Sequence, residues 1–447
     1  MTRAERGVAG LWCTASACAQ IDRDDRAPLP GGVHGSGGRP TPSRQGEIRH
    51  HNALTAKLRA LTMVATHHCP SPALATDQPT LIRDFASRCR ERIEEFEKTQ
   101  VRCGLIGPSG SGKSSLINAI AGERIARVGV VETTNDPLEI SHRGITFVDL
   151  PGCGTRRWPK DTYVERLDLA SYDCFLLVTA QRFYENDAFL FQQLRALGKP
   201  CFVVRNMIDR AIEDGRHDHG HDESEIRRII QQDITAQLEP DPPERVYLTS
   251  ARQPAQHDLQ ALLADIGAAL AGLKQSRFVA DMAAYGQDAL QRKRKVAQER
   301  IPPYAGLAAA NGSLNPIPGL DLAADVSLLL KLGEEISAIY GLTSSQFDYI
   351  KRLLGPKALP SLLTKLAQFG TKYLAREGLI GLLKRLASRE LSRQSTRWIP
   401  LAGPLIAAGI GWQSTFMLGE QLVDEAEALA GEILADILSG NELPQRG

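Results

Sequence analysis

Residues 107–115 read GPSGSGKSS, and this stretch decides the fold. Its spacing, Gly107-x4-Gly112-Lys113-Ser114, is that of a phosphate-binding loop. Glycines allow backbone angles that other residues avoid, so successive N–H groups can point toward phosphate oxygens. Lys113 can then reach the terminal phosphates and Ser114 can ligate Mg²⁺, while a helix starting here directs its positive end toward the anion. The stretch therefore predicts a nucleotide site, but it leaves the base open.

The residues on either side fit this prediction. Residues 101–107, VRCGLIG, form a short apolar run typical of a buried strand, and residues 113–123 have the apolar spacing of a helix. Strand, glycine loop and helix follow in the order that phosphate binding requires. The predicted phosphate contacts are Gly107, Ser109, Gly110, Ser111, Gly112, Lys113, Ser114 and Ser115.

The composition is that of an ordinary soluble protein. The chain has 447 residues, of which 43% are hydrophobic and 23% charged, so it can form two or three domains. With a net charge of +1, nothing indicates nucleic acid as a main partner. The eight cysteines lack metal-ligand spacing, and we interpret them as reduced thiols of a cytoplasmic protein.

The pattern of apolar residues divides the chain. Residues 1–76 are rich in Gly and Pro at their start and lack sustained periodicity, which predicts disorder; alternatively, translation begins at Met63. Residues 77–100 are predicted to form an amphipathic helix.

Two longer regions follow. Residues 101–275 alternate strands with helices, which predicts an α/β domain of the Ras-like class, with a parallel-rich sheet covered on both faces. Residues 276–440 show only helical periodicity and are predicted to form, with the first helix, an all-α domain.

A second motif favours GTP over ATP. An ABC-type ATPase needs a strand ending in Asp-Glu and a Ser-Gly-Gly-Gln signature, whereas residues 144–154 read GITFVDLPGCG. Here Asp149 can hold Mg²⁺ through water, and the Gly152 amide can contact a γ-phosphate. Between the phosphate loop and this strand, Thr133 or Thr134 can supply a second Mg²⁺ ligand from a mobile switch.

The third motif concerns the base. Residues 199–209, KPCFVVRNMID, predict a strand followed by Asn206 and Asp209, the pair expected to recognise guanine. The carboxylate of Asp209 can accept hydrogen bonds from guanine N1 and N2, which adenine does not offer. Met207 replaces the usual lysine, which predicts weaker affinity. After the next strand, Ser250 and Ala251 follow, and the Ala251 amide can meet guanine O6.

Together these motifs resemble those of a bacterial member of the immunity-related GTPase (p47-type) family, which belongs to the dynamin superfamily. The resemblance rests on GVVETTNDP (129–137), on the segment 149–190 with Arg182, Phe183, Asn186 and Asp187, and on CFVVRNMID (201–209), and it covers roughly residues 77–345. It places the switch threonine at Thr134. It implies binding of GDP and GTP, self-association through nucleotide domains in the GTP state, and action at intracellular membranes.

One position bears on hydrolysis. Cys153 stands where small GTPases keep a water-orienting glutamine, and a thiol orients water poorly. We therefore expect slow hydrolysis by Lys113, Thr134 and Gly152, accelerated by a second copy of the protein. The alternative is a non-hydrolysing, GTP-dependent scaffold or membrane-recruitment module.

Two apolar segments raise the question of a membrane, 301–330 and 398–419. The second carries no charge and is long enough to span a bilayer, but it contains prolines and several glycines. Insertion, reversible peripheral contact and a buried helical hairpin all remain open.

Overall fold

A computed structural model describes residues 78–127, 136–181, 185–314, 321–354, 359–391 and 403–440. The chain divides into two units, Met1–Ala75 and Thr76–Gly447, and every described residue belongs to the second. The segment 1–76 predicted to be disordered, and the switch residues 128–135 with Thr134, lie outside the described residues.

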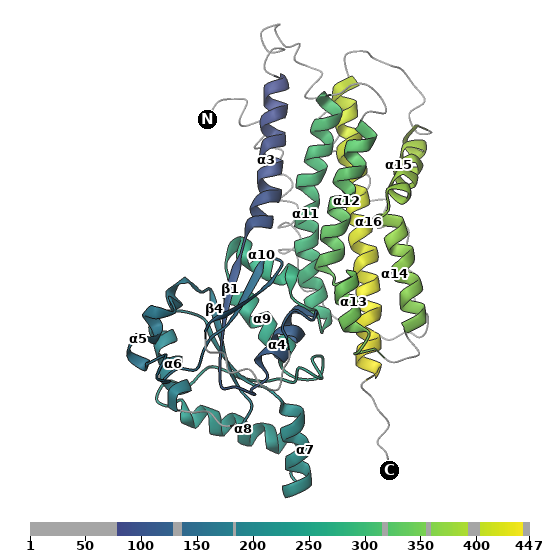
Figure 1. Cartoon of the computed structure of the whole chain (residues 1–447). Coiled ribbons are helices and arrows are strands. Elements are labelled where there is room, and N and C mark those ends of the chain that lie inside the picture. Colours follow the sequence, from purple (N-terminus) through teal and green to yellow (C-terminus); the bar gives the residue numbers. More distant parts are fainter. Residues whose placement is uncertain are drawn as a thin grey trace, which may run out of the picture. The chain divides into compact units, whose positions relative to one another are not determined.

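Within the described residues, the strands form one six-stranded sheet in the order β2-β3-β1-β4-β5-β6 (Figure 1). All neighbouring pairs are parallel except β2 and β3, which are antiparallel. The strands are β1 (Val101–Ile106), β2 (Leu138–His142), β3 (Ile145–Asp149), β4 (Cys174–Thr179), β5 (Cys201–Arg205) and β6 (Val246–Leu248).

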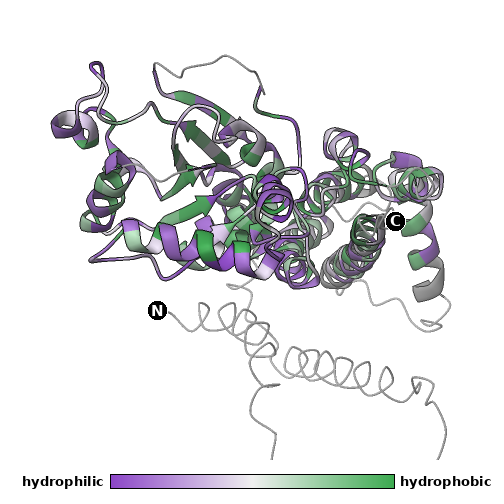
Figure 2. Ribbon diagram, turned by 90° about the horizontal axis from the view of Figure 1, so that it is seen from below, coloured by the Kyte–Doolittle hydropathy of each residue, from purple (hydrophilic) through white to green (hydrophobic). Residues whose placement is uncertain are grey.

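Helices cover both faces of the sheet, because the central strands are apolar on both sides. All six residues of β4 are buried, as expected for a strand between two layers. One hydrophobic cluster joins the sheet to α4, α9 and α10, and another joins its opposite face to α5, α6, α7 and α8. These helices are α4 (Lys113–Ala121), α5 (Lys160–Arg166), α6 (Glu185–Ala196), α7 (Ile208–His219), α8 (Glu223–Gln237), α9 (Leu259–Ala269) and α10 (Gly272–Asp281); a 3-10 turn, η3 (Leu169–Ser171), precedes β4. Figure 2 shows hydrophobic residues in green along the strands.

The second part of the fold is a bundle of helices that includes one from the start of the described chain. Helix α3 packs along α11, and α11 makes its longest contact with α16 (Figure 1). This confirms the fold class predicted from the sequence, a Ras-like α/β domain with an all-α domain. The helices of this part are α3 (Gln78–Lys98), α11 (Gln287–Leu314), α12 (Asp321–Ile339), α13 (Ser344–Ile350), α14 (Leu359–Tyr373), α15 (Arg376–Leu391) and α16 (Gly403–Gly440).

Small residues let α11 and α16 approach closely. A Cβ atom added at Gly411 would lie 2.9 Å from the backbone oxygen of Ala308, and one added at Gly419 would lie 2.8 Å from the side chain of Ile301. Ile301 and Ala308 are fully buried in the core of the bundle. The described residues 301–313 thus pack mainly against other helices.

The described part of α16 carries three exposed large apolar side chains, Trp412 (37% exposed), Met417 (49% exposed) and Leu438 (45% exposed), of which the first two lie within the segment 398–419. Among the described residues, no helix is both long enough and apolar enough to cross a bilayer.

A tight turn at Arg143 and Gly144 joins β2 to β3 and connects the sheet to the bundle. The Arg143 guanidinium donates to the backbone oxygen of Ala338 (2.5 Å) and to Gln346 Oε1 (2.7 Å), and Gly144 N donates to Asp281 Oδ2 (2.9 Å). These hydrogen bonds tie the end of the hairpin to α12, α13 and α10.

Lys293 is buried beside this turn. Its ammonium donates to the backbone oxygens of Val279 (3.1 Å), Ala280 (2.9 Å) and Ile339 (2.5 Å). These oxygens belong to the last turns of α10 and α12, where a cation is favourable. Burial lowers the pKa of Lys293 to about 7.

His142 is buried at the end of β2, and we expect it to make the stability of the fold depend on pH. Burial, assisted by Arg143, lowers the pKa of His142 to about 4. Because the unfolded chain binds this proton near pH 6.5 and the folded chain does not, stability should fall as pH drops from 6.5 toward 4, by at most about 3 kcal/mol. Urea unfolding of the wild type and of His142→Gln, from pH 7 to pH 4.5, should show a shallower decline for the variant.

The matched control is His217→Gln, because the side chain of His217 is 89% exposed. Its stability should follow the wild-type curve at every pH. Parallel curves for wild type and His142→Gln would show that His142 is not the source of the decline.

Candidate nucleotide-binding site

The predicted phosphate loop lies between the end of β1 and the start of α4. Two of its glycines are required by close neighbours. A Cβ atom at Gly107 would lie 2.0 Å from the backbone oxygen of Val178, and one at Gly112 (φ 82°) would lie 2.5 Å from Asn206 Nδ2. Only glycine allows the loop to sit this close to β4 and to the segment after β5.

Lys113 is folded back over the loop. Its Nζ donates to the backbone oxygens of Gly107 (2.8 Å) and Pro108 (3.3 Å) and lies 3.5 Å from Asp149 Oδ1. Both charged side chains are only 9% exposed. Ser109 and Gly110 are exposed at the tip of the loop, Ser111 is buried, and Ser114 and Ser115 are half-buried in the first turn of α4. The buried cation of Lys113 thus lies next to the loop backbone and the carboxylate at the end of β3.

The segment after β3 is held by side chains from α5 and α6. Tyr163 donates its hydroxyl to the backbone oxygen of Pro151 (2.6 Å), and Asn186 Nδ2 donates to that of Cys153 (3.1 Å). Gly152 is exposed, with Thr155 as the nearest neighbour of an added Cβ atom, at 3.9 Å. The Gly152 backbone is therefore open to a ligand.

The thiol of Cys153 is buried in the hydrophobic cluster on the α5 and α6 side of the sheet. Burial raises the pKa of Cys153 to about 11. The Cys153 side chain is therefore a protonated thiol packed in the core, and its effect on hydrolysis stays a prediction.

The remaining switch prediction, Thr134, lies outside the described residues. Asp136, directly after this gap, accepts hydrogen bonds from one guanidinium nitrogen of Arg157 through both carboxylate oxygens (2.6 and 2.8 Å). The end of the switch segment is thus joined to the loop that follows β3.

Asn206 connects the phosphate loop to the predicted base motif. Its buried amide donates to the backbone oxygens of Ser111 (3.0 Å) and Gly112 (3.4 Å), while its Oδ1 accepts from Thr249 Oγ1 (3.3 Å). The structure thus shows Asn206 bonded to protein groups, and its contact with a base stays a prediction. Thr249 was not among the predicted residues, although it directly precedes Ser250 in the LTSA sequence.

Met207 and Asp209 begin α7. Met207 takes left-handed backbone angles (φ 59°, ψ 36°), rare for a residue with a side chain, and its Cε lies 3.0 Å from a Cβ atom placed on Gly112. The methionine therefore packs over the phosphate loop. Asp209, half-exposed in the first helical turn, is open toward solvent.

The loop after β6 contains Ser250 and Ala251. The buried Ser250 Oγ accepts hydrogen bonds from the backbone N–H groups of Arg252 (3.2 Å) and Gln253 (3.3 Å), which forms a tight turn beside the half-buried Ala251. The phosphate loop, Asp149, Asn206, Asp209 and Ala251 follow β1, β3, β5 and β6, so they gather at the carboxyl edge of the sheet, where open α/β sheets bind ligands.

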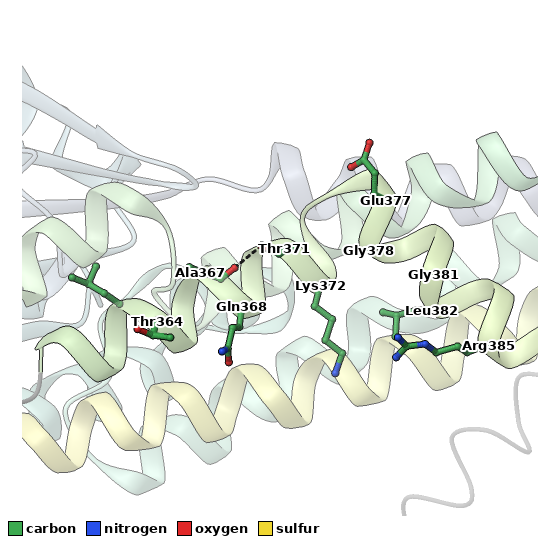
Figure 3. Close-up of a pocket in the computed structure, with 11 residues that line it drawn as sticks. Thr364, Ala367, Gln368, Thr371, Lys372, Glu377, Gly378, Gly381, Leu382 and Arg385 are labelled. Atoms are coloured by element: carbon green, nitrogen blue, oxygen red, sulfur yellow. Dashed lines mark hydrogen bonds between the residues drawn. The ribbon is translucent and has the colours of Figure 1, made fainter.

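Within the described ranges, no group of three or more His, Cys, Asp or Glu side chains could hold a metal. A groove of about 800 Å³ lies elsewhere, between α14 and α15 (Figure 3). Figure 3 shows the Lys372 side chain extending toward α16, where it pairs with Glu425. None of the predicted site residues lines this groove.

Comparison with known proteins identifies the family of this chain. The model of the interferon-inducible GTPase (IIGP) family matches residues 78–356. Interferon-inducible GTPase 5 of Rattus norvegicus is 27% identical over 377 residues, 81% of this chain and 81% of its own; its counterpart from Bos taurus is 28% identical over 360 residues, 77% of each. Among solved structures, a probable GTP-binding protein covers 38% of this chain and 98% of its own, with 19% identity and a TM-score of 0.27.

Proposed function

The chain belongs to the interferon-inducible GTPase family, and from this premise we propose how its own residues bind and hydrolyse GTP. The protein is a GTPase that binds guanine nucleotides. The observation that carries the assignment of the site is the position of Lys113, bonded to the backbone of its own glycine loop and 3.5 Å from Asp149.

In this proposal the N–H groups of the loop 107–115 hold the α- and β-phosphates, and Lys113 shifts from its backbone oxygens to the β- and γ-phosphates. The oxygen donors present fit Mg²⁺, a hard cation that prefers such ligands. Ser114 and Thr134 would ligate it and Asp149 would order its water shell. When bound, the ion neutralises charge that develops on the phosphate oxygens.

For hydrolysis, we propose that the exposed backbone of Gly152 donates its N–H to the γ-phosphate, and that Thr134 closes over this phosphate when the switch orders. The buried thiol of Cys153 leaves this position without a side chain that orients water. We therefore propose slow intrinsic hydrolysis that is accelerated when a second copy docks through its nucleotide domain, as the resemblance to p47-type GTPases of the dynamin superfamily implies.

The proposed domains are the helix 77–100, a nucleotide domain 101–275 and a helical domain 276–440; α10 (Gly272–Asp281) crosses the last boundary. We place the protein in the cytoplasm, in peripheral contact with a membrane through the helical part. Of the segments 301–330 and 398–419, the second has support in the exposed Trp412 and Met417. Co-sedimentation with liposomes in GDP and in a GTP analogue tests this.

The alternative from the sequence, a scaffold that binds GTP without hydrolysing it, rests on the buried thiol of Cys153, whereas membership of a GTPase family argues against it. Single-turnover hydrolysis across protein concentrations separates the two candidates, because a scaffold shows no phosphate release at any concentration.

Replacing Lys113 with Ala should weaken GTP binding at least about 100-fold, since hydrogen bonds to charged groups contribute about 1.5–3 kcal/mol each and Lys113 is expected to make two. Calorimetry measures the affinity, and circular dichroism checks that the variant is folded. Lys274→Ala is the control, because Lys274 pairs with Asp173 at the opposite edge of the sheet. Wild-type affinity in Lys113→Ala would remove the loop from the site.

A further inference from the structure

The loop between β6 and α9 is closed at its base by Asp258. Asp258 N donates to the backbone oxygen of Leu248 (2.9 Å), and Leu248 N donates to Asp258 Oδ2 (3.0 Å). The intervening residues 249–257 include the turn at Ser250 and Ala251. The position of this turn therefore depends on the contacts that hold the end of the loop, at His257 and Asp258.

Arg227, from α8, holds that side. Its NH2 donates to Asp258 Oδ1 (3.1 Å), while its NH1 lies 3.3 Å from His257 Nδ1. A guanidinium has no acceptor, so His257 Nδ1 must accept and the proton of the neutral ring must sit on Nε2. Nε2 lies 3.3 Å from Gln253 Oε1 and can donate to it.

Gln253 completes a chain of contacts that ends at the base turn. Its backbone N–H donates to Ser250 Oγ (3.3 Å), and Ser250 directly precedes Ala251. Arg227, His257, Gln253 and Ser250 therefore form one continuous series of hydrogen bonds from α8 to the residue next to Ala251.

This series requires a neutral His257. Burial lowers the pKa of His257 and the facing Arg227 lowers it further, while Glu223 on α8, Asp209 on α7 and the adjacent Asp258 act in the opposite direction. A proton on Nδ1 would direct an N–H at the Arg227 guanidinium and break the contact.

We propose that Arg227 and His257 are positioning residues for the guanine base: through Gln253 they hold the turn at Ser250 so that the Ala251 N–H can donate to guanine O6. The inference rests on the proposed function. It predicts that disrupting the series weakens only the contact to O6, and that acid does the same by protonating His257.

The test compares GDP with the diphosphate of 2-aminopurine riboside, which lacks O6 and N1–H but keeps the 2-amino group; the loss of N1–H weakens its contact with Asp209 equally in every variant, so each variant is compared with the wild type for the same nucleotide. Arg227→Met and His257→Ala should each weaken GDP binding about 5- to 10-fold, the value of one hydrogen bond of about 1–1.4 kcal/mol, and leave the O6-free nucleotide unaffected. His257→Gln should retain wild-type affinity at pH 7, because its amide can accept from Arg227 and donate to Gln253. The matched control is Arg228→Met. The neighbouring Arg228 is exposed and donates to Gln232 on the same helix, away from His257 and Asp258.

The pH arm measures the same proteins at a series of pH values from pH 7 downward, over the range in which circular dichroism shows them folded. GDP affinity should fall more in the wild type than in His257→Gln, which cannot be protonated. Equal losses for both nucleotides, or an acid response in His257→Gln that matches the wild type, would overturn the inference. A wild type that binds no GDP at all would instead overturn the proposed function.

Discussion

Asp209→Asn is expected to lose GDP affinity by about 10²- to 10⁴-fold and to prefer xanthosine diphosphate. A carboxylate accepts both guanine donors, N1–H and N2–H, and each hydrogen bond to a charged group contributes about 1.5–3 kcal/mol. An asparagine keeps one acceptor and places an N–H₂ group where xanthine carries an oxygen. Competition binding with both diphosphates measures the exchange of preference.

Asp214→Asn is the matched control, because Asp214 lies on the same helix and is exposed. It should bind both nucleotides as the wild type does. If Asp209→Asn kept wild-type GDP affinity, Asp209 would not contact the base and guanine recognition would have to be sought in another part of the sheet edge.

GTP turnover per molecule is expected to rise with protein concentration, by about 10³-fold between the isolated and the associated state. A charged group supplied from outside the active site can accelerate phosphoryl transfer by this amount, and the buried thiol of Cys153 leaves the chain without its own water-orienting side chain at that position. Phosphate release measured over a hundredfold range of concentration, with light scattering in a GTP analogue, tests the dependence.

The Asp209→Asn variant offers a sharper version of this test. Loaded with a non-hydrolysable xanthosine triphosphate analogue, it should stimulate dilute wild-type protein without consuming GTP itself, whereas the same variant without nucleotide should not. Turnover that stays flat in both formats, with the protein monomeric, would favour an external activator or the non-hydrolysing scaffold.

The parts of the fold that the sequence predicted are those with local signals. The strand, glycine loop and helix around residues 101–123 are contiguous, and apolar runs of period two or 3.6 mark most other elements. The antiparallel strand β2 was not predicted, because an edge strand with mostly exposed residues has no apolar run. Helix α7 likewise continues to His219 through a stretch whose polar composition favours a surface loop.

The residues of the candidate site likewise fall into those with a local sequence signal and those brought together only by the fold. The loop glycines, Lys113 and Asp209 could be proposed from the sequence because each motif is short and continuous. The contacts of Asn206 with the phosphate loop, 95 residues away from Ser111, and the series from Arg227 to Ser250 depend on how separate strands are ordered in the sheet. Sequence also cannot tell which way a side chain such as Cys153 points, since that is decided by packing.

The position of α3 bears on how the chain is made. Its buried residues, Ala86, Cys89, Ile93 and Phe96, share a core with α11, and Ile93 contacts Arg300, 207 residues further along the chain. At synthesis rates of about 5–20 residues per second, α3 leaves the ribosome roughly 10–40 s before its partner, with the whole sheet emerging in between. During that time the apolar face of α3 is exposed to solvent. The sheet can therefore fold before the helical bundle assembles.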